Sequence, residues 1–414
     1  MLANFCNYYF HSLYYVPKDS EDGKCLEYSG WPHVGTFQDS YLINTEDYSV
    51  DLRFFPHYQN IEFYSEDTDG CPWYIENIGD VVIFAETSEG TIKLEPGDRK
   101  EVTKETLRTR PRYSRVGICI LQALLNKEDT QAMIDHAYGL GVNFIDTANV
   151  YSSGTSEEYI GAALKNLEIP RDKVVLASKV YFNDGKLSKE AILREIEGTL
   201  KRLQTDYLDL YQIHRFDYDT PIEETMETLD RLVKAGKVRA IGASAMYGYQ
   251  LHNMQICAEK NGWTKFSTMQ NHYNLLYRED ERELIPICRQ YNVFLIPYSS
   301  LAGGHLTHKG WESGSKRSDT DKVLRDKYDP EKDNNLQIVE RVSELAEKYG
   351  VTMTEIALAW HYTTGVAAPI VGATKVPHFD DAVRAVDLSL ADEDIQYLEE
   401  VYKPHRVVGA LPTT

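Results

Sequence analysis

The chain has 414 residues, of which 42% are hydrophobic, enough to bury a sizeable core and more than a single core usually holds. Its 64 Asp and Glu outnumber its 44 Lys and Arg, giving a formal net charge of −20. This charge argues against binding to nucleic acid or to an anionic membrane surface, because both would repel the protein at long range. We therefore expect small-molecule or protein partners, with a homo-oligomer as one possibility.

The N-terminal stretch, the apolar runs and the cysteine spacing predict where the protein is located and whether it binds a metal. The N-terminal stretch has no basic residue before its apolar part, so it is not typical of a signal peptide, and no apolar run is long enough to span a membrane. The six cysteines are scattered without CxxC spacing, which indicates reduced thiols rather than structural zinc. These observations predict a cytoplasmic protein without membrane insertion and without a metal site.

The first quarter of the chain has short apolar stretches between turn residues and no sustained helical spacing. Residues 81–85 and 91–94 are typical of two strands joined around Ser88 to Gly90. We predict a small β-rich domain over residues 1–103 and a charged linker over 104–115. A structural or oligomerisation role is favoured for this domain, and carbohydrate binding stays open because of its tyrosines. A metal-binding cupin is disfavoured, because its histidines are isolated.

From residue 116 to 414, short apolar strands alternate with amphipathic helices, a pattern typical of βαβ units and a parallel sheet. Eight such strands, each usually followed by a helix, predict a (β/α)₈ TIM barrel. They are residues 116–121, 143–147, 173–179, 207–214, 238–244, 267–271, 293–299 and 368–374. The competing architecture, a doubly wound sheet holding a dinucleotide, would usually carry a GxGxxG turn after its first strand, and that turn is missing.

Several helices carry recognisable boundaries. Residues 188–204 form an amphipathic pattern whose apolar face includes Leu193. Thr220 to Glu223 has the spacing of a capping box that would begin the next helix, and Gly236 would end it. A second capping box, Thr352 to Glu355, predicts the start of the helix before the last strand.

Polar residues occur where the predicted strands end. They are Asp146, Lys179, His214, Ser244, Gln270 and Tyr298, and the last strand has Gly372 at the corresponding place. Each has a structural explanation when taken singly: a capping acid, a solvated lysine or a core histidine. Because the strand ends of a barrel converge on one mouth, their coincidence favours a functional site.

The acid, the amine and a nearby phenol suggest a chemistry. A buried, unpaired charge would be costly, so we expect Asp146 to pair with Lys179. The ammonium would then lower the pKa of Tyr151 and prepare it for general acid and base catalysis. His214 could donate a hydrogen bond to a substrate oxygen. Such a site suits protonation of a carbonyl or deprotonation of an alcohol, and it needs a cofactor as its hydride source.

Long collinear stretches of the chain resemble the aldo-keto reductase superfamily. They include FIDTANVY, LASKVY, DLYQIHRFDYDTPIEETMETLDRLVKAGKVRAIGAS, NGWTKFSTMQNHYNLLYRE and APIVGATKV, and the similarity runs from about residue 127 to 411. The chain is most similar to the NADP-dependent aryl-alcohol-dehydrogenase-like branch, which also resembles potassium-channel β subunits. The resemblance implies a (β/α)₈ barrel that binds NADP(H) at its mouth and transfers hydride to a carbonyl.

The resemblance also implies roles for individual residues. Asp146, Tyr151, Lys179 and His214 match the catalytic tetrad, with Tyr151 as proton donor. Ser244 and Gln270 would hold the nicotinamide carboxamide, and Tyr298 would stack on the ring. Other implied cofactor-binding residues are, at the pyrophosphate, Ser299, Leu301, Gly304 and Leu306, and, at the adenosine end, Gly372, Thr374, Lys375 and Asp381. A cation at Lys375 would favour NADP over NAD.

Some positions depart from the family's pattern. The first strand runs almost directly into the first helix, so the first barrel loop is largely missing and the site would be open. Ala245 and Ala382 replace polar residues, and Ser300 and Gly303 stand where proline and a larger residue are common, which predicts a more flexible phosphate loop.

Three function classes remain open at this point. The leading hypothesis is an NADPH-dependent reductase of aldehydes or ketones. A nucleotide-binding regulatory or redox-sensing protein with little turnover is the alternative, suggested by the channel-subunit resemblance. A metal-dependent barrel isomerase is weaker, because Lys179 would oppose a cation between Asp146 and His214.

Overall fold

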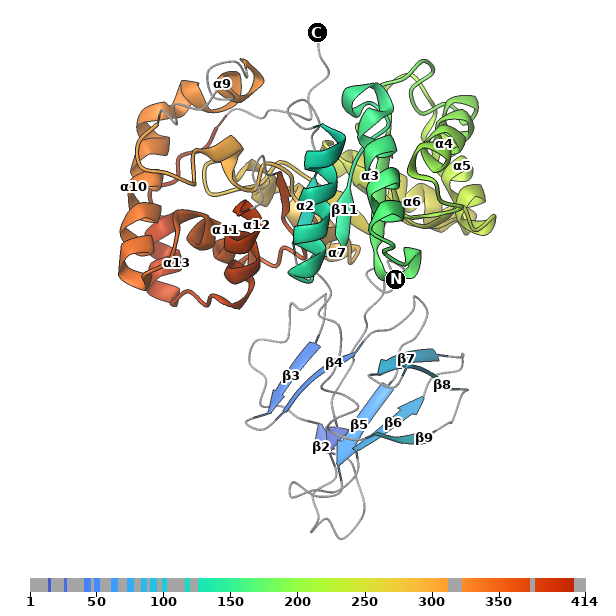
Figure 1. Cartoon of the computed structure of the whole chain (residues 1–414), viewed down its shortest axis with the longest axis horizontal. Coiled ribbons are helices and arrows are strands. Elements are labelled where there is room, and N and C mark those ends of the chain that lie inside the picture. The colour runs from blue at the N-terminus through green and yellow to red at the C-terminus, as the bar shows by residue number, and fades with distance from the viewer. Residues whose placement is uncertain are drawn as a thin grey trace. The chain divides into compact units, whose positions relative to one another are not determined.

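The computed structural model divides into two compact units, residues 1–112 and 113–414 (Figure 1). It describes side chains for residues 116–119, 126–311, 325–372 and 377–405, together with the backbone of residues 322–324 and of the strands before residue 103. The predicted linker, residues 104–115, lies outside the described residues. The predicted domain limits therefore stay a proposal.

The described strands of the first unit are short and pair in antiparallel fashion: β1 with β2, β3 with β4, β5 with β6 and β6 with β9, and β7 with β8. The hairpin predicted around Ser88 is confirmed, with strands that begin and end about two residues from their expected limits. The nine strands are Tyr14–Tyr15, Leu26–Glu27, Tyr41–Thr45, Tyr48–Leu52, Ile61–Ser65, Trp73–Asn77, Ile83–Thr87, Gly90–Leu94 and Arg99–Val102.

The second unit is the predicted (β/α)₈ barrel. Eight parallel strands are hydrogen-bonded in the order β16, β15, β14, β13, β12, β11, β10, β17. The sheet curls so that Ile370 N donates to Pro297 O (2.8 Å), which links the last strand to the chain just after β16. The strands are β10 Gly117–Cys119, β11 Phe144–Asp146, β12 Val175–Val180, β13 Leu208–Ile213, β14 Val238–Ser244, β15 Thr268–Gln270, β16 Phe294–Leu295 and β17 Ile370–Gly372.

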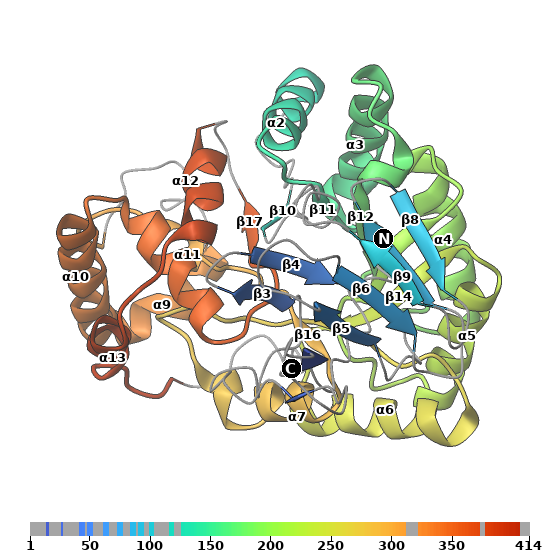
Figure 2. The same cartoon turned by 90° about the horizontal axis from the view of Figure 1, so that it is seen from below.

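Burial on both faces explains why the strands are mostly apolar. Every residue of β12 and β13 is buried, as expected for a parallel sheet covered by helices on one face and filled by side chains on the other. The helices surround the strands (Figure 2). They are α2 Lys127–Gly139, α3 Thr155–Asn166, α4 Lys189–Leu203, α5 Ile222–Lys234, α6 Gly248–Asn261, α7 Leu284–Gln290, α9 Lys322–Tyr328, α10 Lys332–Tyr349, α11 Met353–Thr363, α12 His378–Arg384 and α13 Asp392–Glu399.

The helix boundaries test the local signals. The capping box of α11 is confirmed, with hydrogen bonds in both directions between Thr352 and Glu355. The capping box expected at Thr220 is wrong: α5 begins at Ile222 without a side-chain cap, and the Thr220 hydroxyl donates to Asp217 instead (2.7 Å). Asp217 is buried, and a buried carboxylate is stable only when it accepts hydrogen bonds. The Thr220 hydroxyl therefore bonds to Asp217 and does not cap α5.

The apolar face of α4 is only partly as expected. Ile192 and Ile196 are fully buried, but Leu193 is 39% exposed. No helix among the described residues is long and apolar enough to cross a membrane. A cytoplasmic location stays a prediction.

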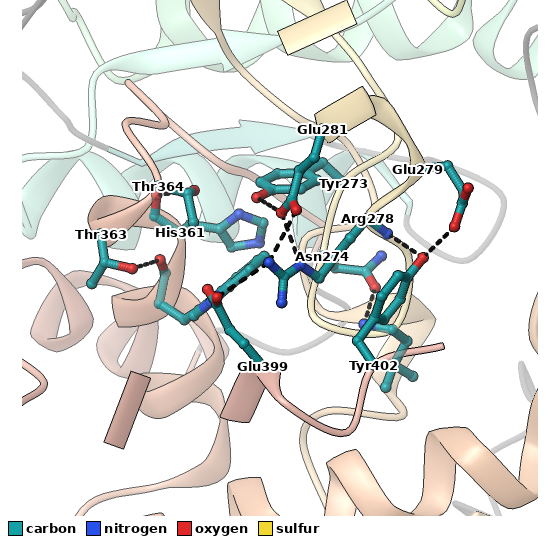
Figure 3. Close-up of polar contacts among 12 residues, drawn as sticks. Tyr273, Asn274, Arg278, Glu279, Glu281, His361, Thr363, Thr364, Glu399 and Tyr402 are labelled. Atoms are coloured by element: carbon teal, nitrogen blue, oxygen red, sulfur yellow. Dashed lines mark hydrogen bonds and ion pairs between the residues drawn. The ribbon is translucent and has the colours of Figure 1, made fainter. Parts of the chain in front are cut away.

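A network around Arg278 fastens the described end of the chain to the loop after β15 (Figure 3). Two of its guanidinium nitrogens donate to Glu281, at 2.8 and 3.0 Å, and one of these also lies 3.2 Å from Glu399 at the end of α13. The Tyr402 hydroxyl accepts from the backbone N of Arg278 and donates to Glu279, both at 2.8 Å. From the same loop, Asn274 donates to Ser299 O (2.9 Å), so the network helps to fix the loop after β16.

Candidate active site

A cavity of about 560 Å³ lies at the carboxyl ends of the barrel strands. Residues from distant parts of the sequence meet in it, as the strand-end pattern predicted. The predicted site residues that line it are Asp146, Tyr151, His214, Ser244, Gln270, Tyr298, Ser299, Leu301, Gly304, Gly372 and Asp381.

Four predicted site residues are not among those that line the cavity. Lys179 and Leu306 are both fully buried. Lys179 lies against two residues that line the cavity, Asp146 and Tyr151. Thr374 and Lys375 lie outside the described residues, so their part in binding the adenosine end stays a prediction.

The predicted ion pair is present in the barrel interior. Lys179 Nζ donates to Asp146 Oδ2 (2.5 Å) and to the carbonyl of Thr147 (2.8 Å), and it lies 3.5 Å from the Tyr151 hydroxyl. Lys179 and Asp146 are both fully buried. The ammonium is therefore balanced mainly by the carboxylate, and the phenol is its more distant neighbour.

Gln212 completes the surroundings of Asp146 and was not predicted as a site residue. Its Nε2 donates to Asp146 Oδ1 at 3.0 Å, and Gln270 Nε2 donates to the same oxygen at 3.0 Å. With Lys179 on the other oxygen, the carboxylate receives three hydrogen bonds. In the sequence, Gln212 is one of two buried polar side chains, with Asp209, inside the strand LDLYQI, and nothing local marks it as a site residue.

Ser244 and Gln270, expected at the nicotinamide carboxamide, lie next to each other on β14 and β15. Ser244 Oγ donates to the backbone carbonyl of Gln270 (2.8 Å). The side-chain amide nitrogen of Gln270 is engaged by Asp146, so this residue also supports the ion pair.

The pKa of the Tyr151 phenol differs from the expectation. Its pKa lies well above the ordinary value, and burial is the largest cause, followed by the neighbouring Cys119, Asp146 and Tyr298. The predicted lowering of this pKa by Lys179 is wrong for the protein as described. The ammonium forms its short bonds with Asp146 and Thr147, and Asp146 opposes a second negative charge nearby. Tyr151 therefore keeps its proton at neutral pH.

The segment that follows Tyr151 has an unusual backbone. Ser152, Ser153 and Gly154 have φ angles of 49°, 56° and 94°, three consecutive residues in the left-handed region. Serines adopt this region at a cost, which persists only when the surroundings enforce it. Close by, at the start of α3, Glu157 accepts from Ser178 Oγ (2.5 Å) and Arg202 Nε (2.6 Å), which anchors the end of the helix that follows this segment.

His214 follows β13 and lies beside the phenol. Its ring centroid is 5.7 Å from that of Tyr151, in an edge-on arrangement. Burial lowers the pKa of His214 well below its ordinary value, and the charges of Lys179 and Arg215 act in the same direction. The imidazole is therefore neutral at pH 7. Its Nδ1 is buried and has no hydrogen-bond partner among the residues that the structure describes.

The loop after β16 forms another wall of the cavity. Tyr298 stacks on His272 with ring centroids 5.3 Å apart, and Lys327 Nζ lies 4.9 Å from the centroid of the Tyr298 ring. Left-handed φ angles at Ser299 (56°) and Gly304 (113°) shape the turn.

The residues of this loop that depart from the family's pattern have clear positions in the structure. Ser300, which stands where proline is common, donates from its hydroxyl to Pro297 O and to Ile370 O, both at 3.1 Å. It thus ties the loop to β17. Ala245 and Gly303 line the cavity, and Ala382 is fully buried in α12. The first barrel loop, residues 120–125, lies outside the described residues.

Comparison with known proteins agrees with this geometry. A model of the aldo/keto reductase family matches residues 120–403. The chain belongs to this family, and its membership supports an oxidoreductase that acts on carbonyl groups. The match begins after the N-terminal unit, which it does not include.

Individual relatives are similar over the same part of the chain. An aldo-keto reductase of Fusarium vanettenii is 41% identical over 314 residues, which is 69% of this chain and 85% of the relative. Versiconal hemiacetal acetate reductase of Aspergillus parasiticus is 40% identical over 310 residues, which is 69% of this chain and 90% of the relative. A putative aryl-alcohol dehydrogenase of Schizosaccharomyces pombe is 41% identical over 318 residues, which is 70% of this chain and 89% of the relative.

Proposed function

We propose that the protein reduces an aldehyde or ketone with NADPH, and that Tyr151 gives the proton to the carbonyl oxygen. The observation that carries this proposal is the meeting of Tyr151, His214 and the buried Lys179–Asp146 pair at one cavity. Family membership and the printed names of the relatives, reductases and aryl-alcohol dehydrogenases, support it.

The residues around the cavity fit a dinucleotide. The cavity is lined by two cationic side chains, Arg215 and Lys327, which suit an anionic ligand. The turn around Gly303 and Gly304 keeps backbone accessible: a Cβ added at Gly304 would meet no atom within 4 Å. We propose that Ser244, Gln270 and Tyr298 hold the nicotinamide end, where the bound cofactor would supply hydride to the carbonyl carbon.

Each remaining side chain has a task in this proposal. Tyr151 keeps its proton and can pass it to the oxygen that gains negative charge as the carbonyl is reduced. Neutral His214 can donate a hydrogen bond to that oxygen and so orient the substrate. When Tyr151 has lost its proton, the Lys179 ammonium at 3.5 Å stabilises the phenolate until water returns the proton.

The variant Tyr151→Phe tests the proposal, because it removes the acidic hydroxyl and keeps the ring. We expect turnover of a carbonyl probe such as 4-nitrobenzaldehyde to fall by about 100-fold or more, while NADPH binding, followed by nicotinamide fluorescence, is unchanged. Parallel titration with NADH measures the cofactor preference. Near-normal turnover by Tyr151→Phe would refute the role of this residue.

The same two assays, NADPH binding and turnover, applied to the wild-type protein separate a reductase from a regulatory nucleotide-binding protein. Tight NADPH binding by the wild-type protein with negligible oxidation over a panel of aldehydes and ketones would favour a nucleotide-binding protein with little turnover.

A further inference from the structure

His272 is stacked on two tyrosines at one wall of the cavity. Tyr298, which is proposed to stack on the nicotinamide, lines the cavity. The imidazole of His272 lies nearly parallel to the Tyr298 ring, with ring centroids 5.3 Å apart and an angle of 15° between the planes. Tyr277 is also nearly parallel to the imidazole, at 4.3 Å and 14°. His272 is buried and is not among the residues that line the cavity.

Backbone pairing brings these rings together. His272 and Tyr298 are partners in a parallel bridge, and Tyr298 N donates to Asn271 O (2.9 Å). The chain then turns back, so that Asn274 and Tyr277 exchange two backbone hydrogen bonds, at 3.1 and 2.9 Å. The places of both tyrosines beside the imidazole are therefore set by the main chain.

A hydrogen bond to α9 fixes the imidazole in its plane. The Tyr328 hydroxyl lies 2.7 Å from His272 Nε2 and accepts from Asn274 Nδ2 (2.9 Å). The preceding residue, Lys327, places its ammonium 4.9 Å from the centroid of the Tyr298 ring. One helix thus contacts both the imidazole and the tyrosine that the imidazole supports.

We propose that His272 is a positioning residue for the cofactor: its ring holds Tyr298 in the orientation on which the nicotinamide stacks. This inference rests on the proposed function. A tyrosine at a cavity wall can adopt other rotamers unless its neighbours restrict it. Flat rings favour offset parallel contacts, so the fixed imidazole favours a parallel Tyr298 ring, and the flat nicotinamide can continue the stack.

Two substitutions in the full-length protein separate the flat ring from the hydrogen bond. His272→Asn removes the ring and keeps a polar side chain. His272→Phe keeps a flat ring and loses the bond to Tyr328. His252→Asn is the matched control, because His252 Nδ1 also lies 2.7 Å from a tyrosine hydroxyl, that of Tyr291, but His252 does not line the cavity.

The measurements compare two ligands by titration calorimetry. One is NADPH, and the other is adenosine 2′,5′-bisphosphate, which has the adenosine end of the cofactor and no nicotinamide. The Kd for NADPH in His272→Asn should rise by about five-fold, the effect of one aromatic pair. The Kd for the bisphosphate should stay unchanged. His272→Phe and the control should bind both ligands like the wild type.

A double substitution tests whether His272 acts through Tyr298. Tyr298→Ala should weaken NADPH binding by itself, and adding His272→Asn to it should have little further effect, because the ring that the imidazole supports is already absent. Fully additive losses would contradict the inference. If His272→Asn does not fold, His272→Leu replaces it, since leucine keeps an apolar side chain and removes the flat ring.

Three other results would overturn the positioning role. They are a His272→Asn protein that binds NADPH as tightly as the control, an equal loss for NADPH and the bisphosphate, and a His272→Phe protein as weak as His272→Asn. A wild-type protein that binds no NADPH would remove the proposed function and this inference together. If the wild type binds NADPH and Tyr151→Phe is inactive, a normal His272→Asn protein would remove only the positioning role.

Discussion

Replacing Lys179 with methionine should destabilise the barrel strongly, because it leaves the Asp146 carboxylate buried without its ammonium. Methionine keeps most of the volume of the lysine stem, so the change removes charge more than packing. Asp146 is fully buried and, within the described part of the chain, would retain only the hydrogen bonds from Gln212 and Gln270. Breaking a buried ion pair by removing one partner costs about 3 to 5 kcal/mol. At about 2 °C per kcal/mol for a large domain, Tm should fall by about 6 to 10 °C.

The effect should also depend on pH in a definite direction. A buried carboxylate without an ammonium favours its protonated, uncharged form, which the folded variant takes up more readily than the unfolded chain. Stability relative to the wild type should therefore recover as the pH falls from neutrality towards about 5. Scanning calorimetry of both proteins at several pH values measures this difference. A deficit caused by lost packing alone would be the same at each pH.

A matched control is available on α5. Lys234 also forms an ion pair with an aspartate, Asp230, but its side chain is 65% exposed. Lys234→Met should cost less than about 1 kcal/mol. The reasoning would be refuted if Lys179→Met melted within about 2 °C of the wild type, or if its deficit did not change with pH.

Two further predictions concern the backbone after Tyr151 and the neighbouring imidazole. Ser153→Gly should raise the stability of the folded state by up to about 1 kcal/mol, because glycine adopts the left-handed φ of 56° without strain; a lower Tm in calorimetry would contradict this. His214 should be neutral throughout the range from about pH 6 to 8, because burial depresses its pKa. The pH profile of kcat/KM should therefore show no acid limb near pH 6.5, and such a limb that disappears in His214→Asn would refute the assignment. The free energy of unfolding should decrease as the pH falls below the ordinary pKa of histidine, about 6.5. In that range the unfolded chain takes up a proton that the buried His214 does not.

The sequence alone was sufficient for the features that depend on neighbours along the chain. The alternation of apolar strands with amphipathic helices predicted the eight-stranded barrel, and Thr352 and Glu355 predicted the start of α11. The strand-end pattern placed Asp146, His214 and Tyr298 at one cavity. These predictions succeed because periodicity and capping are local, and because parallel strands of a barrel must end on the same side.

The tertiary structure decided what depends on partners distant in sequence. Thr220 does not cap α5, because the buried Asp217 takes its hydroxyl. Gln212 and His272 were not singled out as site residues by the sequence analysis, since a glutamine inside a strand or a histidine in a loop carries no signal until the fold shows its neighbours. The pKa of Tyr151 is raised rather than lowered, because burial and the competing bond between Lys179 and Asp146 outweigh the nearby ammonium. Charges and hydrogen bonds act through distance and desolvation, and only the folded chain fixes both.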